Sequence, residues 1–345
     1  SLVTASRLVS FAVSALLLGS APSDLYAELQ QTAQTYRAHI AAVAPVAGRD
    51  TTYDYYQRLL DDTDLVQQKT PPPPYTQAQW TQLVENTASL DISLATQLLS
   101  GEYRSMASIR GLGETLVRSS RDGTMQPVAV YVPSSYVPGS PAPLVVFLHG
   151  HGQAETSLLA PFYITQLAEQ SGAILIAPWG HGYYDYRASQ AEVYDALQAA
   201  EQAFTIDSRQ RYLAGYSMGG FSVFVVAPVH PEDWAGVMCI AGGLLGSDSR
   251  RLVTYMRTKP FYVLTGSQDE VIPTYYPTTT TAYLQAAGFE VSFYSQPGGT
   301  HRLVSLMPIL TQAWSDMFHH VIRAPPPQFG ALELPAAIPT MALKP

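Results

Sequence analysis

The stretch that decides the fold lies in the second half of the chain. Residues 211–226 read Arg-Tyr-Leu-Ala-Gly-Tyr-Ser-Met-Gly-Gly-Phe-Ser-Val-Phe-Val-Val. We expect residues 211–214 to form a strand and residues 221–226 a buried helix, with the glycine-flanked Ser217 at a tight turn between them. This arrangement is a nucleophile elbow, which presents a serine hydroxyl above a sheet at a helix N-terminus. The alternative is a glycine-rich turn with an incidental serine.

Two residues further along the chain can supply the base and the acid that a nucleophilic serine requires. Asp269 follows an apolar strand pattern at residues 261–265, and His301 follows another at residues 291–294. Because the carboxyl ends of parallel strands meet at one edge of a sheet, we expect both side chains near Ser217. The chain order of serine, acid and histidine also matches a known order for such triads.

Other readings of these two residues remain open. Asp269 could cap a turn, and Glu270 is the next candidate for the orienting acid. His301 could be an ordinary loop histidine. His319 and His320 are poorer candidates for the base because they lie on a predicted terminal helix.

A glycine-rich loop follows the apolar strand pattern at residues 144–148. Such a loop can direct a backbone N–H at the oxyanion of a tetrahedral intermediate. We assign the two donors to the backbone N–H groups of His151 and Met218, with Gly150 as the alternative to His151. His149 and His151 lack a set of acids or cysteines at metal-ligand spacing, so we expect no metal site. The predicted chemistry needs no organic cofactor either.

From about residue 111 onward, short apolar runs alternate with helical stretches. The expected strands are residues 144–148, 173–177, 212–215, 236–241, 261–265 and 291–294. The expected helices lie near residues 156–170, 190–204, 218–228, 248–257, 277–287 and 303–321. Residues 115–118 and 128–132 flank Arg-Asp-Gly and predict a hairpin. The predicted fold class is therefore α/β, with a mostly parallel twisted sheet covered by helices on both faces.

The N-terminal part of the chain shows helical spacing and no strand pattern. Thr76 and Gln79 form a capping-box signature after a run of four prolines that ends at Pro74. We divide the chain into three parts: a helical N-terminal extension that acts as a lid or a brace (1–105), a catalytic domain (106–322) and a proline-rich tail (323–345). Residues 1–21 are either a signal-like leader or an apolar helix.

Composition limits the classes of partner and site. The net charge is −8 and only three lysines occur, so the surface is unsuited to binding a nucleic acid. Cys239 is the single cysteine and lies in an apolar run, which favours a core position. The apolar run near the N-terminus is too short for a stable membrane span. We expect a secreted or periplasmic protein if that run is a signal, and a cytoplasmic one otherwise.

Residues from about 111 to 322 resemble the α/β-hydrolase superfamily. The segments 148–153 and 215–220 resemble the polyhydroxybutyrate-depolymerase and feruloyl-esterase group, and also prolyl-oligopeptidase-like esterases. The resemblance implies the α/β-hydrolase fold and a triad of Ser217, Asp269 and His301. The depolymerase group often has cysteine at the position of His151. A backbone donor tolerates that difference, since it uses no side-chain atom.

Aromatic residues gather in one expected loop after the third core strand. They are Trp179, His181, Tyr183, Tyr184 and Tyr186. With Tyr216 they could bind an aryl or sugar-linked acyl ester, or they could anchor the loop to the N-terminal helices. The leading hypothesis is a serine esterase acting on an aryl, cinnamoyl-type or polyester-type ester, small or polymer-linked. A peptidase or amidase, an acyltransferase and a non-catalytic scaffold are the alternatives, and the oligomeric state is open.

Overall fold

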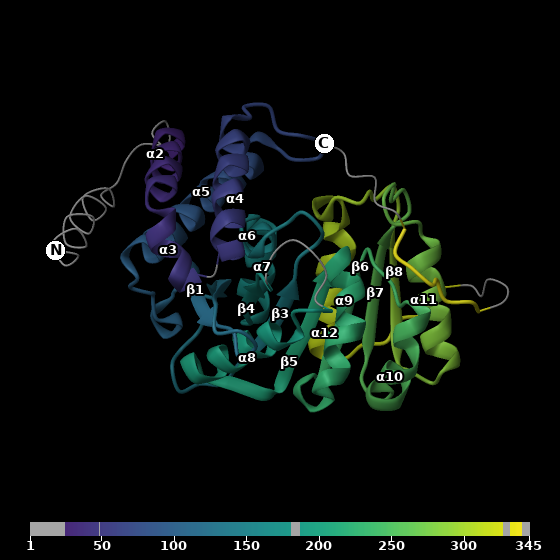
Figure 1. Ribbon diagram of the computed structural model, residues 1–345. Coiled ribbons are helices and arrows are strands. Elements are labelled where there is room, and N and C mark those ends of the chain that lie inside the picture. Colours follow the sequence, from purple (N-terminus) through teal and green to yellow (C-terminus); the bar gives the residue numbers. More distant parts are fainter. Residues whose placement is uncertain (1–24, 48, 181–186, 327–331, 340–345) are drawn as a thin grey trace.

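The protein folds around one central sheet, seen in the computed structural model (Figure 1), which describes residues 25–47, 49–180, 187–326 and 332–339. Within these residues, eight strands follow the order β1-β2-β4-β3-β5-β6-β7-β8. Their bounds are Gly111–Arg118 (β1), Met125–Val132 (β2), Ala142–Leu148 (β3), Ile174–Pro178 (β4), Ile206–Tyr216 (β5), Gly236–Ile240 (β6), Phe261–Gly266 (β7) and Val291–Gln296 (β8). The β1–β2 and β2–β4 pairs are antiparallel, and the other neighbouring pairs are parallel. The predicted hairpin and the mostly parallel sheet are therefore confirmed.

Helices cover both faces of the sheet. One face packs against α6 (Glu155–Leu159), α7 (Phe162–Ser171) and α12 (Met307–His319). The other packs against α8 (Gln190–Ala203), α9 (Met218–Val226), α10 (Gly246–Met256) and α11 (Tyr275–Ala286). On β3, Val146 belongs to one hydrophobic cluster and Phe147 to the other, as expected when side chains alternate along a doubly covered strand. Cys239 is fully buried on β6, as its apolar surroundings predicted.

Two predicted helices differ from those in the structure. The helix expected near residues 156–170 is divided into α6 and α7, because Pro161 stands at the N-cap of α7 and cannot continue a helix. The helix expected over 303–321 opens as a 3₁₀ turn, Leu303–Leu306, and becomes α12 at Met307, where a proline follows at the second position.

The N-terminal helices gather at the β1 end of the sheet (Figure 1). They are α2 (Leu25–Ala38), α3 (Ile40–Ala47), α4 (Arg49–Gln67) and α5 (Gln77–Ser100). Thr76 and Gln79 form the predicted capping box at the start of α5, with reciprocal hydrogen bonds of 3.2 and 3.0 Å. Buried residues of α2, α4 and α5 form one cluster with Leu116 and Met125 of the hairpin, so these helices share a core with the sheet.

The described part of the tail lies against α10 and α11. The Tyr275 and Tyr276 hydroxyls donate to the carbonyls of Glu333 and Ala337, and the Gly246 N–H donates to that of Pro335. The predicted leader or apolar helix at residues 1–21 lies outside the described residues. No helix among the described residues is both long and apolar enough to cross a membrane.

Candidate active site

Ser217 occupies the sharp turn between β5 and α9. Its backbone has φ +55° and ψ −116°, a conformation that costs energy for any residue with a Cβ and that recurs at functional sites. The Ser217 N–H donates to the carbonyl of Ile240 at 2.8 Å, which ties the turn to β6. Although Ser217 is the N-cap of α9, its side chain makes no capping hydrogen bond. The hydroxyl is therefore available to another partner.

The two glycines that flank the serine allow the backbone segments to come close. A Cβ on Gly215 would lie 2.0 Å from the carbonyl oxygen of Gly219, and a Cβ on Gly219 would lie 2.1 Å from that of Leu148. Both distances are far below a van der Waals contact. The spacing Gly-x-Ser-x-Gly is thus required by the approach of α9 to β3 and β5.

The structure brings Ser217, His301 and Asp269 together, although they come from three separate loops. Ser217 Oγ lies 2.8 Å from His301 Nε2, and His301 Nδ1 lies 2.9 Å from Asp269 Oδ2. Asp269 Oδ1 accepts hydrogen bonds from the backbone N–H groups of Val271 and Ile272 at 2.9 and 2.8 Å. One carboxylate oxygen is therefore fixed by the backbone, and the other is directed at the imidazole.

Glu270, the alternative acid, contacts a different part of His301. Its Oε2 accepts from the backbone N–H of His301 at 3.1 Å, so this carboxylate holds the main chain rather than the ring. His319 and His320 stand at the end of α12, where His319 Nδ1 contacts the Ser315 carbonyl.

Tyr216 supports the histidine from the side of the elbow. Its hydroxyl donates to the carbonyl oxygen of His301, and the two rings lie 5.3 Å apart between centroids. Burial, and then the charge of Asp269, raises the pKa of Tyr216, so the hydroxyl keeps its proton and remains a donor.

The loop of residues 149–154 borders the elbow. The Gly150 N–H, the alternative oxyanion donor, already donates to Gln153 Oε1 within the loop at 2.8 Å. His151 is half-buried in the same loop. Met218 is the first residue of α9, where a backbone N–H has no acceptor within the helix. His149 is fully buried, and its ring nitrogens lie 2.8 and 3.0 Å from the carbonyl oxygens of Gly150 and Trp179.

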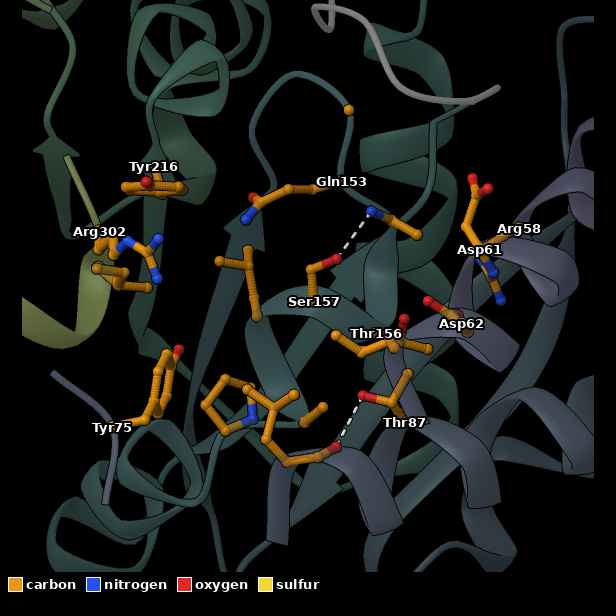
Figure 2. Close-up of a pocket in the computed structure, with 18 of the residues that line it drawn as sticks. Arg58, Asp61, Asp62, Tyr75, Thr87, Gln153, Thr156, Ser157, Tyr216 and Arg302 are labelled. Carbon is orange, nitrogen blue, oxygen red and sulfur yellow. Dashed lines mark hydrogen bonds between the residues drawn. The ribbon is translucent and has the colours of Figure 1, made fainter. Parts of the chain in front are cut away.

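A pocket of about 310 Å³ opens beside these residues (Figure 2). Tyr216 and Arg302, the chain neighbours of Ser217 and His301, line it together with Tyr75. Figure 2 shows the opposite wall, where α4 and α5 contribute polar side chains. These are Arg58, Asp61, Asp62 and Thr87. The N-terminal helices thus form one wall of this pocket, and the chain neighbours of Ser217 and His301 lie on the other.

The predicted aromatic contacts need one correction. Trp179 is fully buried and does not line the pocket; Arg58 Cζ lies 5.7 Å from the centroid of its ring. A side chain without exposed surface cannot contact a substrate, so for this residue the anchoring alternative fits. His181, Tyr183, Tyr184 and Tyr186 lie outside the described residues.

Behind the pocket, the side chain of Arg58 is buried among carboxyl groups. Its Nη1 lies 2.7 Å from Glu155 Oε2 and its Nη2 lies 3.2 Å from Asp91 Oδ1. Two further acids complete the cluster: Asp62 interacts with Asp91, and Glu114 of β1 with Glu155. Buried carboxyl groups that lie this near to one another disfavour each other's charged form. Burial, and then the charge of Glu155, raises the pKa of Glu114 well above its usual range.

We expect Glu114→Gln to reduce the loss of stability with rising pH. The folded protein keeps a proton on Glu114 that the unfolded chain releases above about pH 4.3, so wild-type stability falls as pH rises toward the folded pKa. The fall is at most about 1.4 kcal/mol per pH unit for one proton. Glutamine has no proton to lose. The melting temperature of the variant should therefore fall less than that of wild type as the pH rises from about 5 to about 9. The exposed Glu102→Gln is the control; equal pH slopes for all three proteins would contradict the expectation.

Part of the chain is similar to known esterases. Residues 119–251 match the protein-family model "Esterase". The chain is 24% identical over 164 residues to "Probable feruloyl esterase C" of Aspergillus oryzae, covering 45% of this chain and 61% of that protein. It is also 24% identical over 180 residues to a bifunctional acetylxylan esterase/xylanase of Neocallimastix patriciarum, covering 50% and 24% of the two chains. The chain thus spans less than two thirds of each relative.

Solved structures show the same fold. A thermostable esterase superposes with a TM-score of 0.51 at 20% identity, over 60% of this chain and 62% of that one. A ferulic acid esterase of Anaeromyces mucronatus, solved with ferulic acid, gives a TM-score of 0.50 at 17% identity, over 60% and 90%. With the sheet order, the elbow and the esterase-family match in view, the predicted resemblance to the α/β-hydrolase superfamily is confirmed, and the described part of the chain has the α/β-hydrolase fold.

Proposed function

We propose that the protein is a serine-dependent carboxylic ester hydrolase. Ser217 is the nucleophile, His301 the general base and Asp269 the acid that orients the imidazole. The observation that carries the proposal is the unbroken series of contacts from Ser217 Oγ to His301 Nε2 at 2.8 Å and from His301 Nδ1 to Asp269 at 2.9 Å. These are the distances that proton transfer from a serine to an oriented imidazole requires.

In the first half of the reaction, Ser217 Oγ attacks the ester carbonyl carbon while His301 Nε2 takes the hydroxyl proton. The oxyanion is stabilised by the N–H of Met218 and by a second donor from the 149–154 loop, which we assign to His151 because Gly150 already has an acceptor. His301 then gives its proton to the departing alcohol, which leaves the acyl group on Ser217. Water, activated by the same imidazole, hydrolyses the acyl-enzyme and restores the hydroxyl.

The pocket beside Ser217 is the proposed site for part of the ester. Its lining combines tyrosine rings with polar and charged groups, which suits an aromatic or hydroxyl-bearing group better than a long alkyl chain. The curated relatives are named for feruloyl and acetylxylan esters. We therefore propose an aryl or cinnamoyl-type ester, small or polymer-linked, with polyester-type substrates as the next choice.

An ester panel tests this proposal. We expect the full chain to hydrolyse p-nitrophenyl acetate and methyl ferulate at least about 100-fold faster than a p-nitroanilide of the same acyl group, and a fluorophosphonate probe to label Ser217. Faster cleavage of the anilide would favour the peptidase or amidase alternative. Ester formation with an added alcohol in place of hydrolysis would favour the acyltransferase, and folded protein without labelling would favour the scaffold.

A further inference from the structure

One buried side chain, that of Arg58, contacts two residues that adjoin the 149–154 loop, Glu155 and Trp179. This residue belongs to α4 in the N-terminal helices, 97 positions before Glu155 in the chain. Only 3% of Arg58 is exposed, so nearly all of its surface contacts protein, although it also lines the pocket. A residue of the N-terminal helices thus contacts the immediate neighbours of the loop that borders the nucleophile.

At the C-terminal end of the loop, the contact is an ion pair. Glu155 is the first residue of α6 and follows the loop directly. It is fully buried, and its carboxylate lies 2.7 Å from Arg58 Nη1. The Ala154 N–H donates to Ser157 Oγ at 3.0 Å, so the end of the loop is joined to the same helix (Figure 2). A shift of Glu155 would therefore move the backbone at Ala154.

At the N-terminal end of the loop, the contact is indirect and runs through Trp179 and His149. The ring of His149 lies between the carbonyl oxygens of Gly150 and Trp179. The indole of Trp179 is in turn buried beneath the guanidinium of Arg58, at 5.7 Å from Cζ to the ring centroid. Loss of the guanidinium would leave a gap over the ring of Trp179, and the backbone carbonyl of Trp179 is one of the two that contact His149.

We propose that Arg58 is a positioning residue, which fixes the 149–154 loop so that its backbone N–H lies where the oxyanion forms. This inference rests on the proposed ester hydrolysis and assigns a part of it to the N-terminal helices. Arginine suits the position because its planar fork pairs with two carboxylates, Glu155 and Asp91, while its face lies over Tyr55 at 4.6 Å. Lysine has one charged nitrogen and no such face.

The test compares Arg58→Met with a matched variant of the full chain, Arg121→Met. Arg121 also pairs with a buried glutamate, Glu192 of α8, at 3.1 Å, but neither residue contacts the 149–154 loop in the described structure. We expect Arg58→Met to lower kcat on p-nitrophenyl acetate by about 10- to 100-fold with KM changed less than about 3-fold, since a small misplacement of a catalytic donor has effects of that size. Arg121→Met should keep kcat within about 2-fold.

Arg58→Lys is a second variant, which keeps the positive charge and provides a test if Arg58→Met does not fold. It should fold and lose kcat to an intermediate extent, because it keeps one ion pair and loses the contact with Trp179. The inference would be overturned by an unchanged kcat in either Arg58 variant, by a change confined to KM, or by an equal loss of kcat in Arg121→Met. A wild-type protein that hydrolyses no ester would instead remove the proposed function, so the two failures are distinguishable.

Discussion

Replacement of Ser217 by alanine should lower kcat on p-nitrophenyl acetate by about 10⁴- to 10⁶-fold, because the variant lacks the hydroxyl that forms the acyl-enzyme. The fold should survive. Alanine has the same Cβ as serine, so the backbone conformation at φ +55° becomes no harder to adopt. The substitution removes one hydrogen bond to His301 and leaves the Ser217 backbone bond to Ile240 in place.

The measurement is a steady-state rate together with fluorophosphonate labelling and a melting curve. Ser222→Ala is the matched control, since Ser222 is also a buried serine of α9 and its hydroxyl donates to the Met218 carbonyl. We expect this control to keep its rate and its labelling. A Ser217→Ala protein that melts normally and still hydrolyses the ester within about 10-fold of wild type would refute the assignment of the nucleophile.

Local sequence patterns were sufficient to predict the sheet and the residues that gather at its edge. The elbow could be read from Gly215 and Gly219 around Ser217, because the close approach of α9 to β3 leaves no room for a side chain there. Asp269 and His301 could be found because each lies in the loop that follows a strand, and parallel strands bring such loops to one edge.

The pocket wall and its support could not be predicted in this way. Arg58 and Asp91 lie on helices whose polar positions look like solvent-facing ones, and their partner Glu155 follows a loop far along the chain. Nothing in the local pattern of α4 distinguishes a buried arginine from an exposed one. The contacts that make it buried are long-range, so they appear only when the N-terminal helices are packed on the sheet.

Trp179 shows a different limit of sequence patterns. It follows β4 at the correct edge of the sheet, a position compatible with a substrate contact and equally with anchoring to the N-terminal helices. The structure buries it beneath the guanidinium of Arg58, where its large ring packs between α4 and the sheet. Position at the edge of a sheet thus predicts where a backbone lies, but the direction of the side chain depends on what packs against it.

Asp269→Asn should lower kcat by about 10⁴-fold while the protein stays folded. The structure gives the physical reason. Asp269 Oδ1 accepts from the N–H groups of Val271 and Ile272, so in asparagine the amide oxygen must occupy that position. The NH₂ group then faces His301 Nδ1 as a donor, which requires Nδ1 to be the acceptor and places the ring proton on Nε2. An imidazole protonated on Nε2 cannot take the proton of Ser217.

Glu270→Gln provides the matched comparison, since the same type of change is made one residue away. Glu270 accepts from the backbone N–H of His301, and a glutamine oxygen can accept that bond equally well. We therefore expect the rate to stay within about 5-fold of wild type. If Asp269→Asn kept its rate and Glu270→Gln lost it, the orienting acid would be Glu270. The 2.9 Å contact of Asp269 with the ring, against a backbone contact for Glu270, argues for the first outcome.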